Sequence, residues 1–203
     1  MFVTIEGIEG SGKSTLLSGL SERLRSEGRK IFATREPGGT PVGDAIRKIF
    51  LEPGLVIAPL TEALLVNAAR AQHVTDVIRP ELEGGAFVIC DRFVDSTLAY
   101  QGYGRGIDLA LLRNMCDTAT GGLYPDRVFL VDVPLEISRA RMAARHPEAD
   151  RVEAEGDAFH QRVRYGFLEL ALGSKRHRVL DGRLPAAELV ELAYRDVTEE
   201  ARR

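Results

Sequence analysis

The fold is decided by one stretch near the start of the chain, Gly7-Ile8-Glu9-Gly10-Ser11-Gly12-Lys13-Ser14. It matches the phosphate-loop pattern G-x-x-x-x-G-K-[ST], with an apolar run before it at Phe2–Ile5 and an amphipathic segment after it from Lys13. The glycines allow a tight turn whose backbone N–H groups converge on phosphate oxygens, and the start of the following helix adds unpaired donors. Lys13 can reach the β- and γ-phosphates, and the Ser14 hydroxyl can ligate Mg²⁺. The stretch therefore predicts a protein that binds a nucleoside triphosphate.

Around this loop, short apolar runs rich in β-branched residues alternate with helix-length amphipathic stretches. The runs that predict strands are Phe2–Ile5, Ile31–Ala33, Phe87–Cys90, Val128–Val133 and Val179–Leu180. The stretches that predict helices are Lys13–Glu27, Leu60–Arg79, Leu135–Arg145 and Ala186–Glu200. Strict alternation of strand and helix is typical of a parallel sheet covered by helices on both faces. We therefore expect one α/β domain over residues 1–203, a P-loop NTPase with a five-stranded parallel sheet flanked by helices.

Composition and charge exclude several classes of protein. Apolar residues make up 44% and charged residues 28% of the 203 residues, which is a globular composition. The 27 Lys and Arg against 30 Asp and Glu give a net charge of −3, which argues against a nucleic-acid partner bound through a basic field. The start of the chain lacks the pattern of a secretory signal, and no apolar run approaches the roughly 20 residues that cross a bilayer, so no membrane partner is expected. Cys90 and Cys116 match neither a metal-ligand spacing nor a disulfide framework, so we expect a cytoplasmic protein in which Cys90 is a buried small residue.

Two stretches fit the alternation poorly. Residues 35–59 contain REPGGTPVG and EPG and predict short structure between loops. Residues 146–157, HPEADRVEAEGD, are polar and densely charged, which favours a segment that covers a site over one that builds a core. Loops of this kind serve as lids or binding loops, although exposed connectors are also common. We therefore expect a short lid over about residues 142–157.

A carboxylate follows the predicted strand Phe87–Cys90. Asp91 stands where the carboxyl ends of parallel strands gather ligands, so it is a candidate for organising Mg²⁺, with a helix cap as the alternative. Arg92 favours the metal, because a guanidinium beside a metal-linked carboxylate can bind a second phosphate. Asp132 ranks second for the metal and can instead cap the next helix, since Pro134 follows.

Missing motifs narrow the class of NTPase. Neither the guanine-reading N/T-K-x-D nor the D-x-x-G of switch GTPases occurs in the chain, which is also short for a motor or AAA-type ATPase. Small kinases are what remains, and they tend to need a lid and several arginines because water must be kept from the transferring phosphoryl group. Four arginines precede or lie within the predicted lid: Arg139, Arg141, Arg145 and Arg151. Arg141 and Arg145 lie one helical turn apart and share a face.

With these motifs the chain resembles a known family, the thymidylate kinases and in particular the bacterial ones, nearly from end to end. The resemblance is carried by residues 5–15 (IEGIEGSGKST), 34–40 (TREPGGT), 69–73 (ARAQH), 91–102 (DRFVDSTLAYQG), 125–126 with 130–133, and 150–153 (DRVE) before a helix ending in FLEL at 167–170. The P-loop is shared by many NTPases, whereas REPGGT together with DRFxxSTxAYQG is close to diagnostic. The resemblance implies a fold of nucleoside monophosphate kinase type, Mg²⁺-dependent transfer from ATP to dTMP giving ADP and dTDP, and a homodimer with residues 60–80 and 107–119 as candidate interface.

The resemblance also implies roles for individual residues on the ATP side. The ATP-binding set is Gly7, Ile8, Glu9, Gly10, Ser11, Gly12, Lys13, Ser14 and Thr15, with Arg141 near the base or phosphates of ATP. Ser14 and Asp91 are the metal candidates. The P-loop contains no arginine, and family members of this type use a lid arginine to stabilise charge on the transferring phosphoryl group. Arg145 is the first candidate and Arg151 the second, so the catalytic set is Lys13, Asp91, Arg92, Arg145 and Arg151.

On the acceptor side, Glu9 resembles the family carboxylate near the 3′-hydroxyl of the deoxyribose. Arg35 and Arg92 resemble the arginines around the acceptor phosphate. The ring of Tyr100 resembles the one that fills the space of a ribose 2′-hydroxyl and so selects deoxynucleotides. The remaining substrate-binding residues are Arg70 and Thr97 at the thymine edge, Gln101 beside Tyr100 in the signature, and Val66.

Val66 departs from the family pattern. Four residues before the base-reading Arg70 the family usually has a Phe that stacks on thymine, and losing a stacking ring costs ~1 kcal/mol by comparison with aromatic pairs. The favoured interpretation is that the Val66 methyls pack against thymine; compensation by Phe93 or Tyr103, or relaxed base selectivity, are the alternatives. A kinase for another (deoxy)nucleoside monophosphate thus stays open. A nucleotide-binding regulator without transfer activity is disfavoured by the intact catalytic set.

Overall fold

Five parallel strands form the central sheet of the computed structural model, which describes residues 1–144 and 149–200. The strands are β1 (Phe2–Glu6), β2 (Ile31–Arg35), β3 (Phe87–Asp91), β4 (Arg127–Asp132) and β5 (His177–Asp181), in the spatial order β2-β3-β1-β4-β5. All five predicted strands are confirmed. The first three run past their apolar stretches to end at Glu6, Arg35 and Asp91, because ladder hydrogen bonds do not depend on an apolar side chain. Their carboxyl ends meet at one edge of the sheet, beside the phosphate loop.

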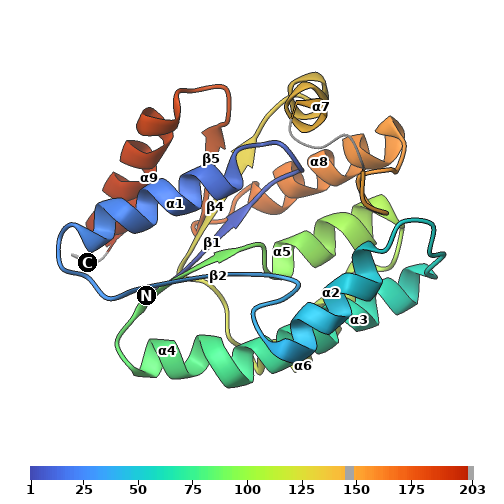
Figure 1. Ribbon diagram of the computed structural model, residues 1–203, viewed down its shortest axis with the longest axis horizontal. Helices are drawn as coiled ribbons and strands as arrows, with labels where there is room; N and C mark the ends of the chain where they lie inside the picture. Colours follow the sequence, from blue (N-terminus) through green and yellow to red (C-terminus); the bar gives the residue numbers. More distant parts are fainter. Residues whose placement is uncertain (145–148, 201–203) are drawn as a thin grey trace.

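Helices cover both faces of the sheet (Figure 1). One face carries α1 (Lys13–Arg25) and α9 (Ala186–Glu200), and the other carries α3 (Pro59–His73), its π-helical continuation η1 (Val74–Ile78), α4 (Arg79–Glu83) and α6 (Leu109–Thr120). Val3 and Ile5 pack under α1 and α9, whereas Phe2 packs under α3 and α6, because successive side chains of a strand point to opposite faces. Cys90 is buried on the second face, as predicted, and both it and Cys116 are free thiols.

The remaining helices pack on α3, on α6 or on one another. They are α2 (Pro41–Leu51), α5 (Val94–Thr97) with its π-helical continuation η2 (Leu98–Gly104), α7 (Leu135–Ala143) and α8 (Asp157–Ala171). Helix α2 departs from the prediction of only short structure over residues 35–59, since it is 11 residues long. Pro41 occupies its first turn and the Thr40 hydroxyl accepts a hydrogen bond from the Gly43 N–H at 2.9 Å. These are ordinary helix start signals, which the glycine- and proline-rich surroundings concealed.

The predicted lid is described in part. Helix α7 ends at Ala143, and Arg145 belongs to the four residues, 145–148, that lie outside the described part of the chain. Residues 149–156 form turns that lead into α8. Val152 is buried in a hydrophobic cluster with Phe50 and Tyr100. The charged stretch therefore also contributes to the core, through Val152, an apolar residue that the charged neighbours made easy to overlook.

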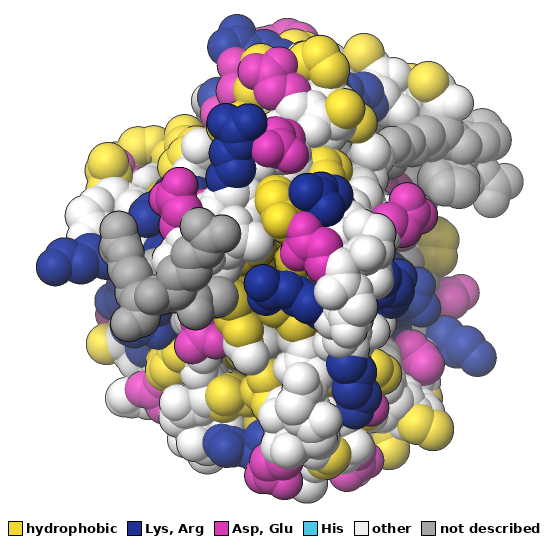
Figure 2. Space-filling view, turned by 90° about the vertical axis from the view of Figure 1, so that its left-hand side faces the viewer, with side chains coloured by type: hydrophobic (Ala, Val, Ile, Leu, Met, Phe, Trp, Pro, Cys, Tyr) yellow, Lys and Arg dark blue, Asp and Glu magenta, His cyan; other side chains and the backbone are white. Residues whose placement is uncertain are grey.

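The surface shows no field of a single sign on the face seen in Figure 2, where Lys and Arg side chains are interspersed with Asp and Glu. This agrees with the net charge of −3. Within residues 1–144 and 149–200, no helix combines the length and the apolar character that a bilayer crossing requires.

Candidate active site

The phosphate loop joins β1 to α1 in a tight turn. Gly7, Gly10 and Gly12 have φ angles of +139°, +66° and +111°, which glycine adopts far more easily than other residues. A Cβ on Gly7 would lie 2.4 Å from the Val131 carbonyl oxygen, and one on Gly10 would lie 2.6 Å from that of Ser138. Space and backbone conformation therefore both require glycine at positions 7 and 10, and backbone conformation alone requires it at position 12. The loop is tight enough for its N–H groups to converge on a phosphate.

Helix α7 supports the phosphate loop from its side. The Ser138 hydroxyl donates to the Glu9 carbonyl at 2.7 Å. Arg141 donates from Nη1 to the Ser11 carbonyl at 3.1 Å and from Nη2 to the Gly182 carbonyl at 2.9 Å. The structure thus brings Arg141, which was predicted to lie near ATP, to the backbone of the loop. The bonds from α7 occupy carbonyl oxygens of the loop and not the N–H groups that a nucleotide would use.

Lys13 lies inside the loop, with only 7% of its surface exposed. Its Nζ donates to the Ile8 carbonyl at 2.8 Å. Burial, together with the positive charge of Arg92, lowers the pKa of Lys13 to about 8 against the opposing effect of Asp91 and Glu9. A phosphate bound here would be an anionic partner for a lysine that is otherwise costly to keep charged.

Ser14 and Asp91 provide oxygen ligands suited to Mg²⁺. The Ser14 hydroxyl lies 3.3 Å from Asp91 Oδ2. Asp91 Oδ1 is buried and has no hydrogen-bond partner among the described residues. A buried, unpartnered carboxylate oxygen beside a hydroxyl fits a small cation that prefers hard oxygen ligands. The two residues predicted as metal ligands therefore fit the ion that the family resemblance implies.

Asp132, the second candidate for the metal, has another partner. Its two carboxylate oxygens accept hydrogen bonds from Arg164 Nε and Nη2 at 2.7 and 2.8 Å. The alternative of a helix cap is wrong, because the residue before α7 is Pro134 and no side chain caps that helix. Asp132 instead joins β4 to α8 through a bidentate ion pair.

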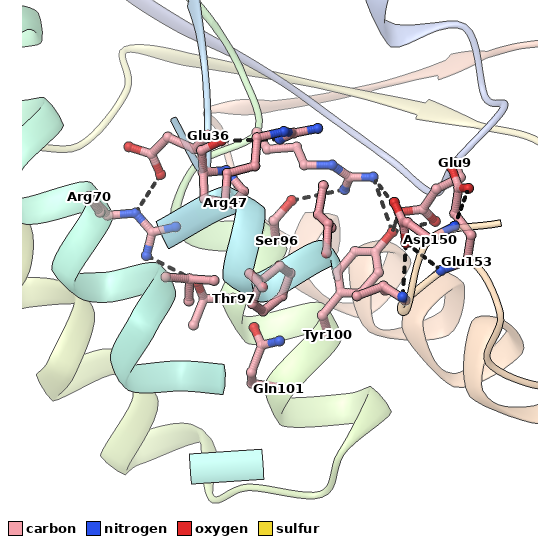
Figure 3. Close-up of a pocket in the computed structure, with 16 residues that line it drawn as sticks. Glu9, Glu36, Arg47, Arg70, Ser96, Thr97, Tyr100, Gln101, Asp150 and Glu153 are labelled. Carbon is pink, nitrogen blue, oxygen red and sulfur yellow. Dashed lines mark hydrogen bonds and ion pairs between the residues drawn. The ribbon is translucent and has the colours of Figure 1, made fainter. Parts of the chain in front are cut away.

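A cavity of about 150 Å³ opens beside the phosphate loop (Figure 3). Seven of the eight predicted substrate-binding residues line it: Glu9, Val66, Arg70, Arg92, Thr97, Tyr100 and Gln101. The eighth, Arg35, lies outside it. The sequence reasoning missed the other lining residues, which are Glu36, Pro37, Arg47, Phe50, Leu51, Ser96, Asp150, Val152 and Glu153. The cavity thus combines an apolar wall with several charged groups, as expected for a nucleotide.

Arg92 connects the cavity to the phosphate loop. Its Nη1 donates to the Gly7 carbonyl at 3.0 Å and its Nη2 to Glu9 Oε1 at 2.8 Å. Tyr100 donates its hydroxyl to the same carboxylate at 2.7 Å. Burial acts to raise the pKa of Glu9, but the charges of Arg92 and Lys13 outweigh it and hold that pKa below its usual value. Arg92 has φ +73°, an unusual backbone conformation for a residue with a side chain.

Arg70 is held rigidly at the far end of the cavity. Its Nε donates to Glu36 Oε2 at 2.8 Å and its Nη1 to the Thr97 hydroxyl at 3.0 Å, as Figure 3 shows. Glu36 Oε1 in turn lies 3.1 Å from His73 Nδ1. Glu36 and His73 stand inside REPGGT and ARAQH, so the motifs were noticed but their buried contact was not. The guanidinium of Arg70 is therefore oriented by Glu36, in the loop after β2, and by Thr97 on α5.

Two further arginines lie within electrostatic reach of Arg92. Arg47, on α2, lines the cavity and donates to the Pro37 carbonyl at 3.1 Å. Burial, and then the positive charges of Arg35 and Arg92, lower the pKa of Arg47. Arg35 is paired in register with Asp91 at the ends of β2 and β3, and its side chain is 60% exposed. Three guanidinium groups thus lie within electrostatic reach of one another, an arrangement that an anion would stabilise.

Arg151 is not among the residues that line the cavity. Its Nη1 pairs with Glu62 Oε1 at 2.5 Å and its Nε donates to the Phe50 carbonyl at 2.8 Å. Gln101, which does line the cavity, donates to Glu62 Oε2 at 3.2 Å. The structure therefore brings Arg151 to Glu62 on α3 and not to the phosphate loop, and it gives the predicted catalytic role of Arg151 no support.

Glu6 makes stability depend on pH. Burial and the nearby charge of Asp95 raise the pKa of Glu6 to about 8, from 4.5. Its carboxyl contacts the Phe93 N–H at 2.7 Å and the Ser96 hydroxyl at 2.6 Å. The folded chain keeps a proton that the unfolded chain releases near pH 4.5, so stability from this group is fully present below that pH and is lost as the pH rises through about 8.

Glutamine at position 6 mimics the neutral carboxyl. We expect the wild type to lose a few kcal/mol of unfolding free energy relative to Glu6→Gln between pH 5 and 8. Urea unfolding of both proteins across this range measures the difference. A difference that stays constant, or that grows in favour of the wild type, would contradict the shift.

Comparison with known proteins identifies the family. A family model described as thymidylate kinase matches residues 5–192. The curated thymidylate kinase of Thermomicrobium roseum is 48% identical over 203 residues, which cover 100% of this chain and 96% of that protein. The chain belongs to the thymidylate kinase family. The curated thymidylate kinase of Carboxydothermus hydrogenoformans is 50% identical over 188 residues, covering 93% of this chain and 92% of that protein.

A solved structure supports the same family. The crystal structure of thymidylate kinase from Ehrlichia chaffeensis has a TM-score of 0.77 and 35% identity, and the match covers 97% of this chain and 98% of that one. The resemblance drawn from the sequence is thereby confirmed, and so is the P-loop fold of nucleoside monophosphate kinase type. In this thymidylate kinase family member, Val66 lines the cavity four residues before Arg70.

Proposed function

We propose that the chain transfers the γ-phosphoryl group of ATP to dTMP, giving ADP and dTDP, a step in dTTP synthesis. One observation carries the proposal: Arg92 donates both to Gly7 in the phosphate loop and to Glu9 in the wall of the cavity, so the two sites share one guanidinium. A donor phosphate on the loop and an acceptor phosphate at the mouth of the cavity would meet there. The family of the chain supports this assignment.

On the donor side, the loop N–H groups and Lys13 bind the phosphates of ATP. Ser14 and Asp91 would hold Mg²⁺, which neutralises charge on the phosphates and orients them when bound. Arg141 keeps the loop in place through the Ser11 carbonyl. Arg145 stays the first candidate for the arginine that stabilises the transferring group, and it lies outside the described residues.

On the acceptor side, Arg92, Arg47 and Arg35 bind the phosphate of dTMP. Glu9, kept charged by Arg92 and Lys13, accepts a hydrogen bond from the 3′-hydroxyl. The buried ring of Tyr100, fixed by its hydroxyl on Glu9, fills the space of a 2′-hydroxyl and so rejects ribonucleotides.

The base occupies the deeper part of the cavity. Arg70, oriented by Glu36 and Thr97, donates to the thymine edge. The methyl groups of Val66 pack on the ring, and Gln101 lies beside it. Transfer then proceeds in line and without a covalent intermediate, so catalysis consists of positioning and of neutralising charge.

A homodimer and a cytoplasmic location stay predictions. Leu60 and Leu64 on α3, and Leu111 on α6, are 50%, 55% and 47% exposed. Exposed apolar residues on neighbouring helices are typical of an interface. They lie within the two segments that the family resemblance suggested for dimer contacts.

A panel of acceptors tests the proposal. With ATP and Mg²⁺ we expect kcat/KM for dTMP to exceed that for dUMP roughly 10-fold, the effect of one methyl group in an apolar pocket, and that for UMP by at least about 100-fold. Coupled assay of ADP release with dTMP, dUMP, dCMP, dGMP, dAMP, UMP and thymidine measures this. A preference for another acceptor would instead favour the kinase of different specificity that Val66 leaves open. No acceptor-dependent ADP release would favour a regulator.

A further inference from the structure

A buried carboxylate near the cavity, outside the assigned machinery, accepts four hydrogen bonds from three side chains. Glu62, on α3, is 1% exposed. Its Oε1 pairs with Arg151 Nη1 at 2.5 Å and with Arg105 Nη2 at 2.9 Å. Its Oε2 accepts from Arg105 Nε at 3.1 Å and from Gln101 Nε2 at 3.2 Å. Burying a carboxylate is costly without such partners, so the site is built around a negative charge.

The partners of Glu62 come from two separate parts of the chain. Gln101 belongs to η2, which forms a wall of the cavity, and Arg105 directly follows η2. Arg151 belongs to residues 149–156 of the predicted lid. Arg105 also pairs with Glu155 of that segment at 2.6 Å. One carboxylate therefore fastens the segment to the wall of the acceptor cavity.

The same segment is fastened at other points and reaches the cavity itself. Arg151 donates its backbone N–H to the Leu51 carbonyl at 3.2 Å. Arg139 of α7 donates to the Glu153 and Glu155 carbonyls at 3.1 and 2.9 Å. Asp150 and Glu153 line the cavity, and Figure 3 shows them on the same side of it as Glu9. The ion pairs of Glu62 are thus one of several anchors of this wall, and they are the ones that tie it to the wall formed by η2.

We propose that Glu62 is a positioning residue that holds residues 149–156 against the acceptor cavity, so that the phosphoryl group passes to the nucleotide and not to water. The proposal rests on the proposed function. A wall that is displaced admits water, whose oxygen then forms the bond to the γ-phosphorus while the bond to the ADP oxygen breaks. ADP, inorganic phosphate and a proton result. Arg151 then acts through Glu62 and not on the phosphoryl group.

Glu62→Gln tests this with a readout that stability alone does not change. The variant keeps the shape of the side chain but removes the acid that pairs with Arg151, and it leaves Arg105 paired with Glu155 alone. We expect the ratio of ADP formed to dTDP formed to rise from one to several, and KM for dTMP to rise about tenfold, since small displacements near a reacting centre have effects of this size. Quantifying ADP, dTDP and phosphate in the same reaction measures the ratio. Arg151→Met should raise the ratio of ADP to dTDP in the same way. Arg151→Lys, which keeps the charge, should bring that ratio much of the way back to one.

Asp196→Asn provides a matched control. Asp196, on α9, is a carboxylate between two arginines, Arg127 and Arg178, each at 2.5 Å, and it lies away from the cavity. We expect this variant to lose thermal stability while the ratio stays at one. A ratio of one in Glu62→Gln, with a loss of thermal stability like that of Asp196→Asn, would overturn the proposal. If the wild type forms no dTDP at all, the proposed function fails instead, and the two failures are distinguishable.

Discussion

Replacing Lys13 by methionine is expected to lower kcat for dTDP formation about a thousandfold, the loss typical of removing a preorganised charge from a transition state. Lys13 lies within the phosphate loop, where burial lowers its pKa to about 8. A charge that is desolvated before substrate arrives acts strongly on phosphate oxygens, since little water screens it. Methionine has a similar length and no charge, so the fold should persist. Initial rates at saturating ATP and dTMP measure kcat, and thermal melts of the variant and the wild type measure the stability of the fold.

The melt separates chemistry from folding. Removing a buried charge relieves a desolvation cost, so the Lys13→Met protein should be at least as stable as the wild type. Lys30 is a suitable control, because it is an exposed lysine whose nearest acid, Glu81, lies 3.1 Å away. Lys30→Met should change kcat less than twofold. Retention of activity within tenfold in Lys13→Met would contradict the role given to this lysine.

Replacing Arg92 by methionine is expected to lower kcat/KM for dTMP about a thousandfold, because one guanidinium serves both the acceptor phosphate and the carboxylate of Glu9. Its contacts reach Gly7, Ser96, Glu9 and Tyr100. The positive charge of Arg92 is the largest effect that lowers the pKa of Glu9, so the pKa of Glu9 should rise when Arg92 is removed. Steady-state kinetics with dTMP varied at saturating ATP measure the effect.

Arg35→Met is the matched control for this change. The Arg35 side chain is 60% exposed and its nearest acid, Asp44, lies 3.9 Å away, so its removal should cost about tenfold. Arg92→Lys keeps the charge and the backbone strain at φ +73° but loses the paired donors of the guanidinium. Its loss of kcat/KM for dTMP should therefore lie between the losses of Arg35→Met and Arg92→Met. An Arg92→Met protein whose defect appears only in KM for ATP would contradict its place on the acceptor side.

Much of the site could be predicted because its residues are grouped in short motifs. The phosphate loop needs glycines at fixed spacing, Gly7 and Gly12, and both have positive φ angles; a Cβ on Gly7 would also collide with Val131. Asp91 follows a buried strand, so its place at the sheet edge followed from the strand itself. The roles of Arg70 and Tyr100 came from the family resemblance, and both residues line the cavity.

Other residues could not be found this way because their partners are remote in the sequence. Arg47 faces the cavity from α2, a helix that the glycine-rich composition concealed. Glu36 and His73 are 37 residues apart and meet only because β2 and α3 pack together. Arg151 is 89 residues from Glu62, and its sequence neighbours suggested a lid arginine without a buried partner. The sequence alone predicts that a charged residue is exposed, because its burial depends on an ion-pair partner that only the folded chain reveals.

The sequence by itself determined the phosphate loop, the alternation of strand and helix and the carboxylate at the end of β3, since each depends on residues close together along the chain. The tertiary structure alone decided which charges meet. The order β2-β3-β1-β4-β5 brings Asp91 beside Ser14, and the packing of α3 against η2 turns Glu62 inward. Each buried charge then requires its partner, because a charge removed from water is stable only beside an opposite charge or a hydrogen-bonding group.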